Sequence, residues 1–490
     1  MAAYPATGNV LEVRTPAPRL PARSELERGF AAIRADLEIE VGFDAEVEAR
    51  AAAVALEPPT GHPRAGAAPV DRTDLEFVTI DPPTSTDLDQ AVHIEQLDDG
   101  FLVSYAIADP STFVAPGDPV DLAAHRRGVT FYCPDTRASL YPAAIGEGAA
   151  SLLPDVDRPA FLWSMRLDSN GYLVDASVVR AVVRSRAKLS YAAAQAHIDA
   201  GTGAPTLALL RTVGELRLER EASRGGVSLN LPSQEVETED GHYVLRHDES
   251  MLVEDWNAQI SLLTGMAAAD LMIHAGIGVL RTLPDPDEGT LHQIRRAALA
   301  LGIDWPKDVT YAERIRDIRP DRPEHIALLT AAVRALRGAD YVAFDGEIPE
   351  ERTHWAIAAE YAHVTAPLRR LGDRYTNEIV VAICAGERPP AWVLHELEEL
   401  PETLREARRR ESRLDRAVVD RVEAALLAHR VGERFRATVT ARRGDRPAPI
   451  QIDDPAIAAV VRTEADPGDV IDVELTAVDV DASRIEFREV

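Results

Sequence analysis

Apolar positions between residues 76 and 108 follow the spacing of β-strands. The run EFVTID at 76–81 is short and rich in β-branched and aromatic side chains, which is typical of a strand. The runs QAVHIEQL and FLVSYAIA follow it, and Asp98, Asp99 and Gly100 lie between them. Because Asp and Gly favour tight turns between paired strands, this pattern predicts one strand followed by a β-hairpin.

Longer segments show helical patterning instead. The last of them, a charged stretch at 402–431, ends beside Gly432, and glycine commonly follows the end of a helix. The other segments with helix formers or helical spacing are 24–37, 44–56, 206–222, 249–274 and 324–338. The centre of the chain is therefore expected to mix strands with helices.

The final region changes to short β-rich runs separated by turn residues. These runs are FRATVTA, PIQI, VIDVELTAV and RIEFREV. Several short strands with turns between them predict a small closed barrel. Near the other end, the Pro- and Gly-rich stretch EPPTGHPRAGAAPVDR at 57–72 predicts a linker.

These patterns divide the chain. Its 490 residues are too many for one ordinary core. We expect an α+β protein with a partly helical N-terminal region and linker at 1–71, a mixed central domain at 72–431 that includes the long helix, and an all-β domain at 432–490.

Composition and charge refine this picture. Hydrophobic residues make up 46% of the chain and charged residues 27%, as in a folded protein. A net charge of −28 argues against a nucleic-acid partner, since phosphate contacts normally come from a basic surface. Only Lys188 and Lys307 among the 53 basic residues are lysines, however, and arginine can bind phosphate through two hydrogen bonds. A GC-rich genome also favours arginine, and an arginine-lined channel inside an acidic shell is compatible with the net charge.

Two further features bear on location. The most apolar long segment, 249–274, contains Glu254 and Asp270, and the N-terminus carries no apolar leader, so we expect neither a membrane span nor a signal peptide. Cys133 and Cys384 lie outside any CxxC pattern, which argues against a disulfide framework and a structural zinc site. These observations favour a cytoplasmic protein.

The stretch TIDPPTSTDLDQA at 79–91 gathers Asp81, Asp87 and Asp89 in one segment. Carboxylates about 4 Å apart repel by roughly 4 kcal/mol per pair at an effective dielectric constant near 20, so such a cluster needs a cation. All-oxygen ligands favour a hard ion such as Mg²⁺ or Mn²⁺. The plainer interpretation is a solvated acidic loop, but its position between a strand and a hairpin favours a metal site.

The stretch YAHVTAPLRRLGDRYTNEIV carries a second group of charged residues. Arg369 and Arg370 follow a proline-broken turn and precede a predicted helix, where a phosphate can lie between an arginine fork and a helix N-terminus. The alternative is a pair of surface arginines. Together with an acidic metal loop, they indicate phosphoryl transfer.

Six motifs in this chain occur in the order and at about the spacing of a known family. They are TIDPPTSTDLDQA, YAIADPSTFV, SRAKLSY, SRGGVSLNLP, LVEDWN and YAHVTAPLRRLGD. Over about residues 75–390 the chain resembles the catalytic RNB domain of the RNase II and RNase R exoribonucleases, and its C-terminal strands resemble the OB-fold RNA-binding domain of that family. The N-terminal region does not resemble the family's paired cold-shock barrels, so substrate capture at that end is expected to differ.

The resemblance implies a catalytic centre. Asp81, Asp87 and Asp89 match the family's magnesium carboxylates, and Gln90 stands where a fourth aspartate is usual. Arg369 matches the arginine that contacts the scissile phosphate. A glutamine offers a neutral oxygen, so we expect a raised metal requirement rather than an inactive site.

The resemblance also implies residues that hold the RNA. Tyr132 matches the aromatic residue that holds the 3′-terminal nucleotide, and Tyr191 and Glu254 match residues that position the last nucleotides and recognise ribose. Leu229 falls where some members stack an aromatic ring on the terminal base. Arg370 is expected to support substrate binding beside Arg369. Each tyrosine has the alternative of an ordinary core residue.

The function implied by this resemblance is Mg²⁺-dependent exoribonuclease activity, with Mn²⁺ as the second candidate ion. Single-stranded RNA would be hydrolysed from its 3′ end to nucleoside 5′-monophosphates. One alternative is a non-catalytic RNA-binding protein that keeps the RNB fold. A metal phosphoesterase acting on small nucleotides is the other, although the predicted RNA-binding barrel argues against it. The sequence carries no signal of an oligomeric state.

Overall fold

A closed five-stranded barrel forms the centre of the molecule. The computed structural model describes residues 23–227, 233–239, 242–248, 251–319, 322–440, 447–452 and 457–490. The barrel strands, in their spatial order, are β1 (Val70–Ile80), β2 (Gln90–Leu97), β3 (Gly100–Ala108), β6 (Asp157–Asp168) and β7 (Leu173–Leu189). The predicted strand and the predicted hairpin are therefore confirmed as β1 and as the pair β2–β3.

Parallel pairing of β1 with β7 closes the barrel and decides which loops meet. All other neighbours in the ring are antiparallel. In the parallel pair Ile80 lies beside Leu189, so both strands end at the same rim, where β2 begins. Bulky side chains such as Phe77, Phe161 and Trp163 are fully buried in this region. The rim at Ile80 therefore brings together segments that are far apart in the sequence.

Four helices pack around the barrel and each other. They are α4 (Tyr191–Ala200), α5 (Pro205–Arg224), α6 (Leu252–Ala275) and α10 (Leu371–Ala385). Gly265 of α6 lets the loop before α10 lie directly on the helix, because a Cβ there would come within 2.6 Å of the Ala362 carbonyl oxygen. That loop carries Arg369 to the barrel rim.

The remaining central elements are shorter. The other helices are α3 (Pro119–Arg127), α7 (Glu288–Ala300), α8 (Tyr311–Asp317), α9 (Pro323–Ala332) and α11 (Ala391–Glu396), with short helical turns at Pro110–Thr112, Ala144–Ala149 and Val333–Leu336. The two-stranded ladders are β4 (Phe131–Tyr132) with β5 (Arg137–Ala138), β8 (Ser233–Glu239) with β9 (His242–Asp248), β10 (Ile277–Thr282) with β11 (Asp340–Asp345), and β12 (Thr353–His354) with β13 (Ala359–Glu360). Helical patterns predicted in the central region are confirmed as α5, α6 and α9.

The N-terminal region contains the two predicted helices, α1 (Arg23–Asp36) and α2 (Ala45–Leu56). The stretch at 57–72, expected to be a linker, is instead fastened to the core up to the start of β1. The Ala65 N–H donates to Glu378 of α10 at 2.9 Å, and the Ala65 carbonyl accepts from Arg180 of β7 at 2.8 Å. Its prolines prevent regular structure but do not prevent tertiary contacts.

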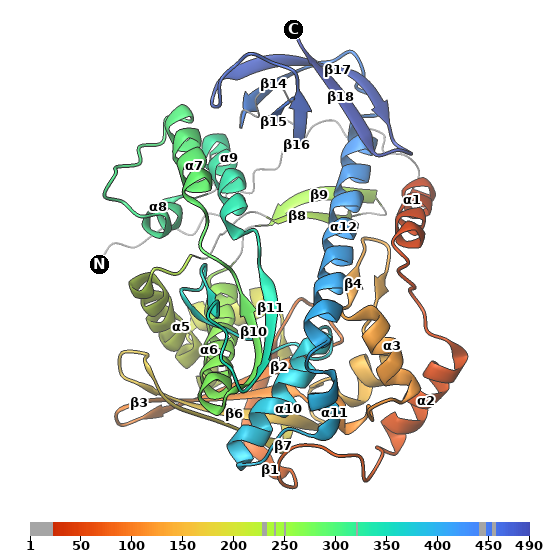
Figure 1. The fold of residues 1–490 in the computed structure, drawn as a ribbon, viewed down its shortest axis with the longest axis vertical. Coiled ribbons are helices and arrows are strands. Elements are labelled where there is room, and N and C mark those ends of the chain that lie inside the picture. The colour runs from red at the N-terminus through yellow and green to blue at the C-terminus, as the bar shows by residue number, and fades with distance from the viewer. Residues whose placement is uncertain are drawn as a thin grey trace.

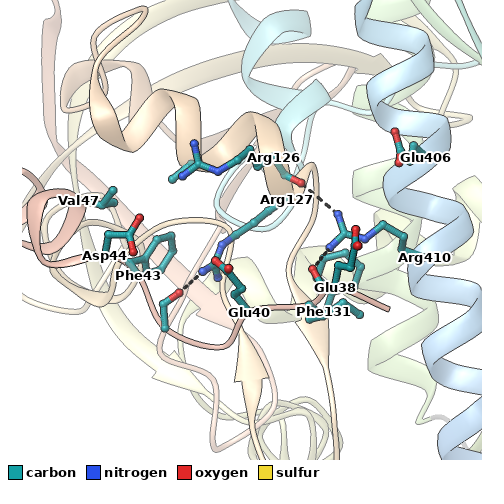
Figure 2. Close-up of a pocket in the computed structure, with 13 residues that line it drawn as sticks. Glu38, Glu40, Phe43, Asp44, Val47, Arg126, Arg127, Phe131, Glu406 and Arg410 are labelled. Carbon is teal, nitrogen blue, oxygen red and sulfur yellow. Dashed lines mark hydrogen bonds between the residues drawn. The ribbon is translucent and has the colours of Figure 1, made fainter. Parts of the chain in front are cut away.

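A pocket of about 340 Å³ lies where the connection between α1 and α2 meets α3 (Figure 2). We call it the N-terminal pocket. Arg127 donates to the carbonyls of Gly42 and of Ser139, the latter at 2.7 Å, while Arg410 donates to the carbonyls of Glu38 at 2.7 Å and Arg126 at 3.1 Å. These contacts fix the N-terminal segment against the central domain.

The long charged helix is confirmed as α12 (Leu400–Leu427), which runs from the region of α10 to the C-terminal sheet (Figure 1). That sheet has the order β16-β15-β14-β17-β18, and its edge strands β16 and β18 also contact each other, so it forms a five-stranded near-barrel. Its strands are β14 (Arg434–Val439), β15 (Ala448–Ile452), β16 (Ile457–Val461), β17 (Val470–Asp479) and β18 (Arg484–Glu489). The chain is thus the mixed α+β protein that was expected, although the sequence pattern did not reveal β16. None of the helices within the described ranges is long and apolar enough to cross a membrane.

Candidate active site

The acidic loop, residues 81–89, joins β1 to β2 at the barrel rim, and neighbouring segments fix its backbone. The Asp81 N–H donates to the last carbonyl of β7 at 3.0 Å. Lys188 donates to the Pro83 carbonyl at 2.8 Å, and Leu88, within the loop, is fully buried. The aspartates therefore extend from a backbone that the barrel holds in place.

Asp89 is the most buried of the three aspartates, with 3% of its surface exposed. Its Oδ1 accepts from the backbone N–H of Leu368 at 2.8 Å, and its Oδ2 accepts from Nε of Arg369 at 3.2 Å. Burial raises the pKa of Asp89 to about 7, although both partners favour the charged form. Asp89 thus connects the acidic loop to the segment that carries Arg369.

Asp81 and Asp87 share this environment but differ in their partners. Burial raises the pKa of Asp81 to about 6, while the nearby charge of Arg369 opposes the rise and that of Asp87 adds to it. Asp87 also raises the pKa of Asp89. One oxygen of Asp87 accepts from Nη1 of Arg137 at 2.9 Å. Asp87 therefore raises the pKa of both other carboxyl groups, and it is also paired with a cation of the chain.

The donor set fits a divalent cation that takes few protein ligands. Among the described residues, no three His, Cys, Asp or Glu side chains are arranged so that they could hold a metal ion. Mg²⁺, however, commonly takes one or two carboxylates and completes its shell with waters and substrate phosphates. The poorly hydrated carboxyl groups of Asp81 and Asp89 suit that role. A third ligand at Asp87 stays a prediction.

Gln90 is hydrogen-bonded at both ends of its amide. Its Nε2 donates to the Thr365 carbonyl at 2.6 Å, and its Oε1 accepts from the Tyr105 hydroxyl at 2.8 Å. The Tyr105 hydroxyl also lies 2.9 Å from Oγ of Ser261 on α6. A carboxylate at position 90 has no proton to donate to the Thr365 carbonyl. The glutamine therefore bridges the barrel to the segment before Arg369.

The two arginines before α10 have different surroundings. The side chain of Arg369 is 46% exposed and pairs with Asp89 through Nε, and neither of its Nη atoms has a hydrogen-bond acceptor within the part of the chain that the structure describes. Arg370 directs its guanidinium to Asp373, with Nη2 at 2.7 Å from Oδ2. Arg369 therefore has donors left for a ligand, whereas the role of Arg370 in substrate binding stays a prediction.

Tyr132 lines a second pocket, which has a volume of about 360 Å³. We call it the arginine pocket. Its walls include Tyr132, Arg281, Tyr341, Arg369, Arg370, Arg408 and Glu411. Tyr132 is 50% exposed, and burial of its hydroxyl end, followed by the charge of Asp87, raises its pKa to about 12. Its hydroxyl therefore keeps its proton at neutral pH and can donate a hydrogen bond.

Tyr191 and Glu254 lie at the starts of two helices, α4 and α6. Tyr191 is the first residue of α4, directly after the end of β7. Burial raises its pKa to about 12, and the charges of Asp81 and then Glu254 add to the rise. Glu254 is in the first turn of α6, where its Oε1 accepts from the Met251 N–H at 2.9 Å. Tyr191 is therefore close to Asp81 and to Glu254, while Leu229 lies outside the described residues.

Three residues of this region were not anticipated from the sequence. Arg137 pairs with Asp87, Tyr105 holds Gln90, and Arg281 lines the arginine pocket. Arg281 could have been noticed in the sequence, because it is the single charged residue in the apolar strand IGVLRT. The other two have no local pattern, because their partners come from distant segments.

Comparison with known proteins identifies the family of the chain. The RNB domain family matches residues 70–386, which is more than half of the chain, and the RNase II-type exonuclease C-terminal S1 domain matches residues 433–490. Ribonuclease R of Escherichia coli is 28% identical over 408 residues, covering 76% of this chain and 49% of the relative. Across the first four curated relatives, the matched region spans 35% to 53% of the relative's length.

Solved structures show the same fold. RNase R of Mycoplasma genitalium, in complex with ribose-methylated single-stranded RNA, has a TM-score of 0.82 at 18% identity and covers 95% of this chain and 78% of its own. Yeast Ssd1, described as a pseudonuclease, has a TM-score of 0.71 at 15% identity, and the match covers 92% of this chain and 58% of Ssd1. The fold is therefore shared by proteins with different activities. The family matches, rather than these distant structures, show that the chain belongs to the RNB-domain exoribonuclease family of RNase II and RNase R, with a C-terminal S1 domain.

Proposed function

We propose that this protein is a metal-dependent exoribonuclease that shortens single-stranded RNA from its 3′ end and releases nucleoside 5′-monophosphates. The observation that carries the proposal is the contact between Asp89 and Arg369, with Asp81 in the same electrostatic environment. Hydrolysis of a phosphodiester needs carboxylates for a metal and a cation for the phosphate. The relatives named ribonuclease R add support, as does the solved complex with single-stranded RNA.

Asp81 and Asp89 would hold Mg²⁺ or Mn²⁺, with Asp87 as the further candidate ligand. The bound ion would lower the pKa of an attacking water and offset phosphate charge. The chain itself supplies the arginine. The free Nη donors of Arg369 would bind the scissile phosphate and stabilise the charge that develops on its oxygens, while Nε stays on Asp89.

The tyrosines would orient the last nucleotides. Tyr132 exposes half of its surface beside Arg369, which suits stacking against a base or a ribose. Tyr191, on α4, is influenced by the charges of both Asp81 and Glu254, the latter on α6. A protonated tyrosine hydroxyl and a carboxylate together can donate to and accept from a ribose 2′-hydroxyl, which would favour RNA over DNA. The S1 domain would add backbone contacts further from the 3′ end.

A non-catalytic RNA-binding protein is the second candidate. It is favoured by the engagement of Gln90 in a bridge where the family usually has an acid, and by the resemblance in fold to a pseudonuclease. Under this alternative the pocket and the S1 domain would still bind the RNA strand, but no bond would be cut.

Incubation of purified protein with 5′-labelled single-stranded RNA separates the two candidates. The exonuclease reading predicts a ladder that shortens from the 3′ end only when Mg²⁺ or Mn²⁺ is added. RNA that stays intact at high enzyme concentration with either ion would contradict it. If the wild type is inactive and Gln90→Asp creates activity, the non-catalytic alternative is correct; if Gln90→Asp only lowers the Mg²⁺ concentration for half-maximal rate, the proposed enzyme is supported.

A further inference from the structure

The arginine pocket carries an unusual excess of positive charge beside the candidate site. Its wall contains Arg281, Arg369, Arg370 and Arg408, against a single acid, Glu411. His354 and His363 also line the pocket. Burial lowers the pKa of His354 to about 4 and that of His363 well below its usual range. Both are neutral at neutral pH, so the charge comes from the arginines.

Three of these arginines have an acid as partner. Arg369 contacts Asp89 at 3.2 Å, Arg370 contacts Asp373 at 2.7 Å, and Arg408 contacts Glu411 at 2.5 Å. The number of arginines alone says little about anion binding. What matters is which guanidinium groups still have donors to offer.

Arg281 is the exception. Within the described ranges, its guanidinium has no hydrogen bond and no ion pair. It lies over the ring of Tyr341, 4.5 Å from the ring centroid. The nearby acid Asp340 is hydrogen-bonded to Nε of Arg405 at 2.8 Å. Arg281 thus keeps its five N–H donors, and the aromatic ring orients the group without satisfying those donors.

Burial lowers the pKa of Arg281; the charges of Arg408 and Arg370 add to this effect, while Tyr341 and Asp340 oppose it. The three cations line the same pocket. Such an arrangement stores repulsion that an anion would relieve, because an arginine fork matches the oxygens of a phosphate. We propose that the arginine pocket is a second phosphate site, centred on Arg281 and completed by Arg408, next to the phosphate that Arg369 contacts.

The ligand is the phosphate group of a nucleotide. Tyr132 and Arg369, which the proposed function assigns to the 3′-terminal nucleotide and the scissile phosphate, belong to the wall of the same pocket. The inference therefore rests on the proposed function for its choice of nucleotide. The phosphate can come from the bound strand or from the nucleoside 5′-monophosphate that cleavage releases. Both offer oxygens to the Arg281 fork.

Binding of 5′-AMP tests the site without any turnover. Calorimetry in EDTA should show binding of 5′-AMP and about tenfold weaker binding of adenosine, which lacks the phosphate. Arg281→Met should weaken 5′-AMP binding by about tenfold. Arg409→Met is the matched control, because Arg409 adjoins Arg408 on α12 and pairs at 3.4 Å with Glu402, outside the pocket. This control should leave binding unchanged.

A second arm measures the dissociation constant of single-stranded RNA as salt is raised, again in EDTA. Arg281→Met should reduce the slope of log K against log[salt] by about one if the strand supplies the phosphate. A change in the 5′-AMP arm assigns the site to the released monophosphate, and a change in the RNA arm alone assigns it to the strand. Unchanged binding in both arms, with a folded variant, would overturn the proposal.

Arg408→Met guards against a folding defect in the Arg281 variant. The Arg408 side chain is 57% exposed on α12, so its replacement should preserve the fold, and it should weaken the same arm as Arg281→Met to a smaller extent. Because neither arm depends on cleavage, an inactive wild type with an intact 5′-AMP response would reject the proposed function and keep the phosphate site. If the wild type is active but Arg281→Met changes neither 5′-AMP binding nor the salt dependence of RNA binding, the proposed function is kept and the phosphate site is rejected.

Discussion

The N-terminal pocket and the arginine pocket have nearly the same volume, about 340 and 360 Å³, and arginines line both. In the N-terminal pocket, Arg127 and Arg410 give their donors to backbone carbonyls, and four acids share the wall with the arginines (Figure 2). In the arginine pocket there is one acid, and Arg281 has no hydrogen-bond acceptor among the described residues. The two pockets are therefore similar in size but differ in their balance of charge, with three arginines against four acids in the first and four arginines against one acid in the second.

This difference separates a structural role from a binding role. An arginine whose donors are satisfied by the chain holds two segments together, whereas one with free donors beside a reactive site is available to a ligand. The same distinction applies to Arg369 and Arg370, of which Arg370 is directed to Asp373. Substitutions in the two regions should consequently affect different quantities.

Of the substitutions considered, Asp89→Asn should have the largest effect, and this effect should be on the rate of RNA cleavage. The asparagine can still accept from the Leu368 N–H but loses the charge for a metal and for Arg369. Loss of several kcal/mol of transition-state stabilisation corresponds to a fall in rate of about 10³-fold. Single-turnover cleavage of labelled RNA measures this. Asp99→Asn, in the exposed turn between β2 and β3, is the control, and equal rates for both variants would reject the metal-loop assignment.

Arg369→Ala should lower kcat by about 10²-fold, because its contact is expected to strengthen as charge develops on the phosphate. The dissociation constant for RNA should change much less, by about fivefold or under. Comparing kcat with RNA affinity at fixed salt gives the result. An equal loss in both quantities would make Arg369 a docking residue.

Arg127→Met should act on stability and leave RNA binding unchanged. Arg127 is 8% exposed, and its removal leaves the carbonyls of Gly42 and Ser139 without their donor. Such a loss costs about 2–3 kcal/mol of unfolding free energy. Urea unfolding measures the cost, and RNA affinity at a temperature where the variant is folded is the second readout. Weakened RNA binding without a loss of stability would remove the distinction between the two pockets.

Glu423→Gln tests an unpaired acid on α12, the helix that contributes to both pockets. Glu423 is 5% exposed and has no ion-pair partner in the described part of the chain, and burial followed by the charge of Asp420 raises its pKa to about 8. A raised carboxyl pKa means that ionisation opposes folding, so its penalty is absent below pH 4.5 and grows up to about pH 8.

The glutamine variant should therefore unfold at a higher temperature than the wild type at pH 8–9 and at nearly the same temperature at pH 5, with a gain on the order of 1–2 kcal/mol at the higher pH. Thermal unfolding across this range measures the difference. Glu219→Gln, on the exposed surface of α5, should show no such dependence. A gain that is equal at both pH values would show that packing, not ionisation, is the cause.

Local patterns predicted the elements whose causes are local. The hairpin of β2 and β3 follows from alternation and a turn at Asp98, and α12 follows from its charged helical spacing and Gly432. The closure of the barrel by β1 and β7 was not predictable in this way, since the paired residues Ile80 and Leu189 are far apart in the sequence. No periodicity in either strand specifies that partner.

Contacts between distant segments also limited what the sequence could predict about the candidate site. Six ordered motifs pointed to Asp89 and Arg369 as site residues, but their hydrogen bond at 3.2 Å is visible only in the structure. The structure pairs Arg370 with Asp373, three residues further along the chain, although the sequence analysis had considered Arg370 only as a residue for substrate or as a surface arginine. The bridge from Gln90 to Tyr105 and Thr365 depends on the closed barrel, and for that reason no local pattern revealed it.

Analysis of the released products tests the central claim most directly. A uniform single-stranded RNA carrying a 5′ label is incubated with wild-type protein and with Asp89→Asn, with and without Mg²⁺, and the small products are identified by mass spectrometry. We expect nucleoside 5′-monophosphates to accumulate from the first turnovers, with wild type and Mg²⁺ only, while the label stays on the shortening strand. Internal fragments, nucleoside 3′-phosphates, or equal products from Asp89→Asn would contradict the account.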